Sequence, residues 1–167
     1  ITLIDEKYEA REGVDILVRD GRVSYIGAEA PAGAGTEVYD GRGKAAMPAF
    51  FNTHCHIPMT LIRGYGEGLS LHDWLFGRMI PFEALLSDED CYWGSLLGIA
   101  ELLASGAVSF TDMYLHTPGI ARAVAESGIK ANLSHGYSTR APGERFTDSA
   151  ACAGTKFLID AAKEVPE

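Results

Sequence analysis

The stretch FFNTHCHIPM, from Phe50 to Met59, places two histidines at the end of an apolar run that is typical of a buried strand. Residues two apart in a strand point to the same face of the sheet, so His54 and His56 can reach one ion while Cys55 faces the other way. Imidazole is a ligand for zinc, iron and nickel. The pattern therefore predicts half of a metal site, although two strand-end histidines bonded to backbone groups would look the same.

Helical and strand patterns alternate after this stretch. Ser87 is suited to cap a helix, because Asp90 lies three residues on and the first turn is acidic. Apolar side chains then recur at helical spacing until Gly106, which is typical of a helix end. The expected order is a strand in AAMPAFFNTH, helical segments in LHDWLFGRMI and SDEDCYWGSLLGIAELLASG, a strand in AVSFTDMY, a helix in PGIARAVAESG, a strand in IKANLSHGYS and a helix over 148–163.

This alternation predicts an α/β fold over residues 46–167. Strands that alternate with helices indicate parallel strands joined by crossover helices. A complete (β/α)8 barrel of the TIM type takes about 250 residues, so the chain after residue 45 is long enough for about three β/α units. We expect either the front part of such a barrel or a small open sheet.

Residues 1–45 have a different pattern, that of short strands. VDILVRDGRVSYIG alternates apolar and polar residues on both sides of Asp20-Gly21, which is a strong signal for a two-residue hairpin turn. A loop rich in Gly, Ala and Pro follows, and then one more short strand leads toward the histidines. We therefore expect part of a small β-sandwich, or a β-flap, in front of the α/β portion.

The composition excludes several classes of protein. The net charge is −9, from 14 basic and 23 acidic residues, whereas nucleic acids and anionic membranes attract basic surfaces. No stretch approaches the apolar length of a membrane span, and no signal peptide opens the chain. The three cysteines are far apart and odd in number, which suits reduced thiols in a cytoplasmic protein.

The motifs around the histidines resemble a known family. MPAFFNTHCHIPMTLIRG is similar to the first barrel strand of the amidohydrolase superfamily, which reads Pro-Gly, two apolar residues, Asn or Asp, and then His-x-His; only Ala49 departs from it. The continuation resembles the branch that contains the methylthioadenosine/S-adenosylhomocysteine deaminases and the chlorohydrolases. That closer likeness is carried by Leu69, Trp74, Leu75, Pro81, Glu83 and the segment GAVSFTDMY, Gly106 to Tyr114.

The resemblance implies an enzyme that hydrolyses a carbon–nitrogen bond, typically by removing an exocyclic amino group from a purine. A divalent metal, zinc or alternatively iron or nickel, would be held by His54 and His56 and would activate water near neutral pH. In the family, the remaining metal ligands and the proton-shuttling glutamate lie on strands after the third. We therefore expect this chain to hold two ligands and part of the pocket, and to be inactive alone.

Four residues are expected on the substrate side. By resemblance, Glu83 matches a glutamate that binds ribose hydroxyls, His135 stands where those deaminases carry an arginine, and Arg145 matches a second arginine in a loop of different length. His116 follows the second strand and is expected near the barrel mouth. Each also has an ordinary interpretation, as a helix cap, a strand-end histidine or an exposed side chain.

Other candidates are expected to be structural. Asp112, near a strand end, either orients a metal ligand or makes a structural hydrogen bond, and Cys55 is expected to pack in the interior. Trp74, Phe82 and Trp93 are assigned to the core or to a pocket wall.

Three functions stay open at this point. The first is a purine or N-heterocycle deaminase, and the second is a chlorohydrolase or other ring deaminase, because the first-strand motif does not select the leaving group. The third is a non-catalytic binding or scaffold protein that lacks the later strands. A barrel front leaves a strand edge unpaired, so we expect either the missing C-terminal part or another copy of the chain as partner, besides a small-molecule substrate.

Overall fold

A computed structural model describes residues 1–138 and 142–164, and the chain divides into two compact units, Ile1–Ala49 and Phe50–Glu167. The strands of the first unit are β1 (Thr2–Ile4), β2 (Ala10–Arg11), β3 (Asp15–Arg19), β4 (Arg22–Gly27) and β5 (Ala45–Ala46). Strand β1 pairs with β2 antiparallel and with β5 parallel. Strands β3 and β4 form an antiparallel hairpin whose turn residues, Asp20 and Gly21, have φ of 50° and 71°. The predicted hairpin is confirmed, since these values are those that a tight primed turn requires.

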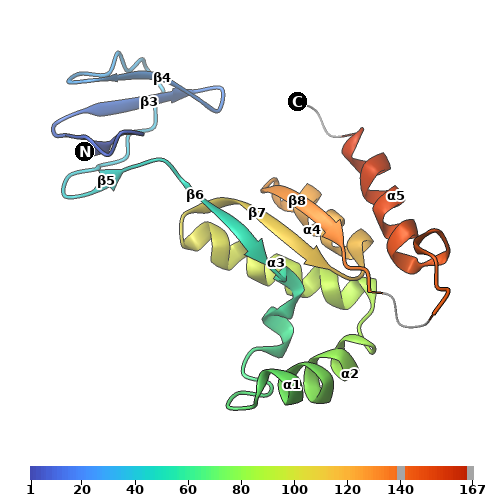
Figure 1. Cartoon of the computed structure of the whole chain (residues 1–167). Coiled ribbons are helices and arrows are strands. Elements are labelled where there is room, and N and C mark those ends of the chain that lie inside the picture. The colour runs from blue at the N-terminus through green and yellow to red at the C-terminus, as the bar shows by residue number, and fades with distance from the viewer. Residues whose placement is uncertain (139–141, 165–167) are drawn as a thin grey trace. The chain divides into compact units, whose positions relative to one another are not determined.

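The second unit alternates strands and helices (Figure 1). Its strands are β6 (Phe50–Cys55), β7 (Ala107–Tyr114) and β8 (Lys130–His135). Its helical elements are η1 (Ile57–Ile62), α1 (Leu71–Trp74), η2 (Leu75–Met79, a π-helical stretch), α2 (Ile80–Glu83), α3 (Asp88–Ala104), α4 (Thr117–Ser127), η3 (Phe146–Asp148) and α5 (Ala150–Ala162). None of the helices in the described part of the chain is both long and apolar enough to cross a bilayer.

The three strands form one parallel sheet with β7 in the centre, which confirms the expected α/β arrangement. Helices α3 and α4 are the crossovers that precede and follow β7, and they pack against each other beside the sheet. Because parallel strands end at the same edge, the residues that close β6, β7 and β8 are brought together there. This edge is where α/β folds of this kind place their functional groups.

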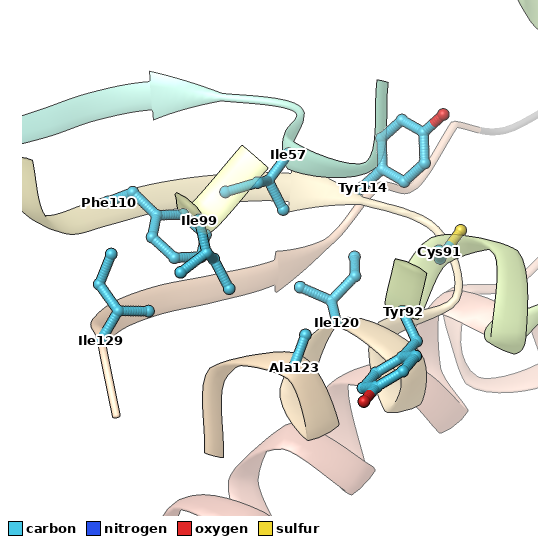
Figure 2. Close-up of a cluster of buried hydrophobic side chains, with 9 residues drawn as sticks. All are labelled: Ile57, Cys91, Tyr92, Ile99, Phe110, Tyr114, Ile120, Ala123 and Ile129. Carbon is cyan, nitrogen blue, oxygen red and sulfur yellow. The ribbon is translucent and has the colours of Figure 1, made fainter. Parts of the chain in front are cut away.

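Buried apolar side chains from the sheet and its two crossover helices form the core of this unit (Figure 2). The members are Ile57, Cys91, Tyr92, Ile99, Phe110, Tyr114, Ile120, Ala123 and Ile129. Helix α3 begins as predicted, with the Ser87 hydroxyl accepting from the Asp90 backbone N–H and the Asp90 carboxylate accepting from the Ser87 backbone N–H. This reciprocal cap satisfies two backbone donors at the helix start.

Helix α3 packs through small residues, which corrects one expectation. A Cβ on Gly94 would lie 2.7 Å from the carbonyl oxygen of Pro58, and one on Gly98 would lie 2.6 Å from Cγ1 of Ile57. The two glycines therefore let η1 approach the helix closely. Trp93 was expected in the core or a pocket wall, but 59% of its surface is exposed, because the helix turns its glycine face, and not its indole, toward η1.

Candidate metal and substrate site

The two histidines of the first strand lie side by side. His54 is in β6 and His56 follows its last residue, and their ring centroids are 5.0 Å apart with an interplanar angle of 80°. Cys55, between them, packs against the core cluster, with its thiol directed to the carbonyl of Thr111 at 3.5 Å. The alternation expected for a strand is therefore present, with imidazoles on one side and the thiol on the other.

His56 is oriented by the backbone of the neighbouring strand. Its Nδ1 lies 2.6 Å from the carbonyl oxygen of Met113, and since a carbonyl only accepts, Nδ1 carries the hydrogen. In the neutral ring, Nε2 is then the nitrogen with a free lone pair. Metal-binding histidines are commonly fixed in this way, by a hydrogen bond from the second ring nitrogen.

Asp112 fixes the chain just after His56. Its carboxylate is 1% exposed and accepts a hydrogen bond from the backbone N–H of Ile57 at 2.7 Å. Burial raises the pKa of this carboxyl, while the hydrogen bond from the Ile57 N–H acts in the opposite direction. Burial is also the first cause that raises the pKa of Cys55 to about 12, with Asp112 adding to it. Of the two roles considered for Asp112, the described contact is the structural one.

Tyr114 lies beside His56, and Glu83 is close enough to influence Tyr114. The Tyr114 ring centroid is 6.1 Å from that of His56, and Tyr114 is the last residue of β7. Burial is the main cause that raises the pKa of the Tyr114 phenol, and the charge and hydrogen bonding of Glu83 come next. Glu83 is therefore close to Tyr114, at the end of β7. Tyr114 was not among the residues predicted for the site, because its sequence position does not distinguish it from an ordinary core tyrosine.

His116 lies at the same end of the sheet but is engaged by a helix terminus. It caps α4 with a left-handed backbone, φ 54°, and its Nδ1 is 3.0 Å from the Asp88 carboxylate at the start of α3. Non-glycine residues adopt this conformation only where the surroundings hold them there. In the described state, His116 links the starts of two crossover helices.

The other two predicted residues are not brought to His54 and His56 by any described contact. His135 closes β8, and its Nδ1–H donates to the carbonyl of Gly136 at 2.8 Å. A Cβ on Gly154 would come within 2.3 Å of its ring, so the imidazole packs against α5. Arg145 is exposed and precedes η3.

A cleft of about 420 Å³ lies between β6 and α3. Its walls are formed by Asn52, Cys55, His56, Ile57, Thr60, Gly98, Glu101, Leu102 and Ser105. None of the four predicted substrate residues lines it. The cleft therefore runs along the free edge of β6 and reaches the strand ends only through His56.

The histidine pair fits a divalent metal as two of its ligands. Within residues 1–138 and 142–164, no group of three or more His, Cys, Asp or Glu side chains is placed to hold an ion. Catalytic zinc sites use three protein ligands and leave a position for water. The described residues could thus offer two imidazole ligands, and a complete centre would need ligands from outside them.

Comparison with known proteins agrees with this geometry. The sequence profile of the amidohydrolase family matches residues 45–166. Over 125 residues the chain is 44% identical to a 5-methylthioadenosine/S-adenosylhomocysteine deaminase from Acetivibrio thermocellus, an alignment that covers 73% of this chain and 29% of that protein.

Two solved structures are similar to this one. An adenosine deaminase from Xanthomonas campestris with bound zinc matches with a TM-score of 0.64 and 25% identity, over 78% of this chain and 31% of that chain. An atrazine chlorohydrolase from Arthrobacter aurescens, complexed with zinc, matches with a TM-score of 0.79 over 99% of this chain and 42% of that chain, at 16% identity. The second likeness shows the fold alone. The aligned part of this chain covers less than a third of the curated deaminase that it matches.

Proposed function

The chain belongs to the amidohydrolase family, and on that premise we propose that it forms the front part of a metal-dependent (β/α)8 barrel that deaminates an adenine nucleoside. Three parallel strands with their crossover helices correspond to about three β/α units of such a barrel. The proposed reaction is hydrolysis of the exocyclic carbon–nitrogen bond. The observation that carries the proposal is the pair of imidazoles, 5.0 Å apart at the carboxyl edge of the sheet, with His56 held by Met113.

His54 and His56 are proposed as two ligands of a divalent metal, with zinc favoured because the similar adenosine deaminase structure contains it. When bound, such an ion supplies activated water near neutral pH. The hydrogen bond from His56 to Met113 has the role of presenting Nε2 to the ion. Asp112 is proposed to support His56 indirectly, because its carboxylate accepts a hydrogen bond from the backbone N–H of the next residue, Ile57.

Glu83 is proposed to bind the ribose hydroxyls of the nucleoside. A carboxylate has two oxygens that accept hydrogen bonds, which suits two neighbouring hydroxyl groups. Support comes from its position near Tyr114 and from the name of the relative that is 44% identical, a deaminase of methylthioadenosine and S-adenosylhomocysteine. His116, His135 and Arg145 are proposed as further pocket residues, because His116 follows the end of β7 by two residues, His135 is the last residue of β8 and Arg145 precedes η3.

The acid–base residues and the remaining ligands are proposed to come from other strands of the barrel. These strands would belong to the missing C-terminal part of a longer protein or to another copy of this chain. The 167-residue chain alone is therefore expected to be inactive. We further propose a cytoplasmic location, which the three free cysteines support.

Metal analysis tests the proposal directly. In the complete enzyme, His54→Ala and His56→Ala are each expected to lower bound zinc at least about tenfold and to abolish deamination of adenosine. The matched control is His72→Ala, because this imidazole is on the surface of α1 with 79% of its side chain exposed.

Three results would count against the assignment. Unchanged metal content in both strand variants would remove the metal site. Equal loss in the His72→Ala control would indicate a general effect on folding. A complete protein that binds zinc but turns over no adenine nucleoside would favour another ring substrate or a binding function.

A further inference from the structure

Tyr114 has a buried hydroxyl group without a partner in good hydrogen-bond geometry. The residue is 4% exposed, and its phenol oxygen is one of three buried polar side-chain atoms without a bond among the described residues. Figure 2 shows the hydroxyl pointing out of the core cluster, away from the other members. A buried polar atom without a partner is costly, so such an atom at a strand end suggests a functional role.

Two features indicate what the hydroxyl serves. The Tyr114 ring stands 6.1 Å from the ring of His56, so it lies beside the proposed metal ligand. Among ionised groups, Glu83 acts most strongly on the phenol, through its charge and through hydrogen bonding. A carboxylate only accepts hydrogen bonds, so a bond between the two groups has the Tyr114 hydroxyl as its donor.

We propose that Tyr114 is a positioning residue that donates a hydrogen bond to Glu83 and holds this carboxylate toward the ribose hydroxyls of the substrate. The inference rests on the proposed role of Glu83. One carboxylate oxygen accepts from the phenol, and enough lone pairs remain on both oxygens for two ribose hydroxyl donors. Without the phenol, the carboxylate turns more freely, so nucleoside binding weakens while the chemical step is unaffected.

Tyr92 offers a matched control. It belongs to the same core cluster and is 8% exposed, but its hydroxyl donates to Glu126 on α4 at 2.6 Å. In Figure 2 the hydroxyls of Tyr92 and Tyr114 lie on opposite sides of the cluster. Tyr92→Phe and Tyr114→Phe therefore each remove one hydroxyl group from the same core cluster. Only Tyr114→Phe removes a hydroxyl group close to His56 and Glu83.

The test compares adenosine with 2′,3′-dideoxyadenosine, which lacks both ribose hydroxyls of interest, in the complete zinc-loaded enzyme. Tyr114→Phe is expected to raise the KM for adenosine about fivefold to tenfold with kcat unchanged, because one hydrogen bond to a charged group is lost. With the dideoxynucleoside, its effect is expected to be less than about twofold. Tyr92→Phe is expected to change neither KM.

A double variant with Glu83→Gln tests whether Tyr114 acts through Glu83 or through the stability of the core. If Tyr114 acts through Glu83, adding Tyr114→Phe to Glu83→Gln changes the KM for adenosine by less than about twofold. An equal rise for both nucleosides, or a full effect in the Glu83→Gln background, would overturn the inference. A wild-type enzyme that deaminates neither nucleoside would overturn the proposed function, and this inference with it.

Discussion

At the residue scale, the environment of His56 is built from main-chain groups and a single carboxylate. The carbonyl of Met113 fixes the ring tautomer, and Asp112 holds the next backbone N–H, that of Ile57. Both partners lie on β7, so the pairing of two strands also sets the orientation of the imidazole. The ring is therefore positioned by the fold before any ion binds.

Cys91 provides a pH-dependent prediction at this scale. Its side chain is fully buried, and burial, followed by the charges of Asp88 and Asp90, raises its pKa from 9.0 to about 12. At pH 8 the native protein should therefore hold roughly a thousandfold less Cys91 thiolate than the unfolded chain. We expect iodoacetamide to alkylate Cys91 far more slowly in the native protein than in urea, as measured by mass spectrometry of the peptide.

The raised pKa of Cys91 also makes the free energy of unfolding depend on pH. Below about pH 9 the thiol is protonated in both the folded and the unfolded state, so it does not change the free energy of unfolding. As pH rises from 9 toward 12, the unfolded chain loses the proton first, so the free energy of unfolding falls. A Cys91→Ala variant is expected to lose this part of the alkaline decline. Rapid alkylation of native Cys91 at pH 8 would show that the thiol is accessible.

The candidate site could be read from the sequence where chemistry and local spacing coincide. The common side of His54 and His56 could be predicted because side chains two residues apart in a strand point to the same face. Tyr114 was missed because neither spacing nor side-chain type separates a buried phenol without a partner from an ordinary core tyrosine. His135 was matched by position alone, and its packing against Gly154 depends on where α5 returns to the sheet.

At the element scale, α3 shows how a helix with little apolar bulk on one side can still pack well. Gly94 and Gly98, four residues apart, lie on one face and accept the turn of η1. The Thr60 hydroxyl donates to the carbonyl of Gly94 at 2.7 Å, so the close approach also provides a polar contact. The chain that follows His56 is held through this contact with α3.

A substitution at Gly98 tests this packing. In Gly98→Ala the new Cβ would lie 2.6 Å from Cγ1 and 3.0 Å from the carbonyl oxygen of Ile57, which is 4% exposed. Overpacking of this kind costs about 1–3 kcal/mol, which exceeds the gain of up to about 1 kcal/mol from replacing a helical glycine. We expect the free energy of unfolding to fall by about 1 kcal/mol in chemical denaturation.

Gly77→Ala is the control, because this exposed helical glycine has no atom within 4 Å of its Cβ position. It should stabilise the protein by roughly 0.5–1 kcal/mol. The informative result is that the free energy of unfolding falls in Gly98→Ala and rises in Gly77→Ala. If Gly98→Ala were as stabilising as Gly77→Ala, the contact between α3 and η1 would be looser than described.

Most elements could be predicted because their signals are local. The cap at Ser87 and the turn at Asp20-Gly21 depend on a few neighbouring residues, and both were identified. The burial of Trp93 was predicted wrongly because apolar spacing identifies a helix but not which side meets the rest of the fold. In α3 the side that meets η1 is the one with Gly94 and Gly98, and glycines do not contribute to a pattern of apolar side chains.

At the scale of the whole molecule, the parallel sheet of the second unit has two open edges. Strand β7 is paired on both sides, whereas β6 and β8 each pair only with β7 in the described part of the chain. Large apolar side chains are also exposed on the edge strand, with Phe51 at 69% and Phe50 at 54%. Parallel sheets are normally covered on both faces and closed or protected at their edges, so these features call for further partners.

The final prediction concerns self-association of the 167-residue chain. On its own, the chain is expected to scatter light as a dimer or larger species, because exposed strand edges and apolar side chains pair with those of another copy. Phe51→Lys places a charge on the edge strand β6 and should shift the population toward the monomer.

Phe76→Lys is the control for this experiment, since Phe76 is similarly exposed, at 58%, but lies in η2 and not in a strand. If association runs through the open sheet, only Phe51→Lys reduces it, whereas both variants reduce it when general hydrophobicity is the cause. A wild-type chain that is monomeric and melts cooperatively would show that the sheet is stable with its edges open. In that case the open edges would not require further strands, and only the proposed metal site at His54 and His56 would still need ligands from elsewhere.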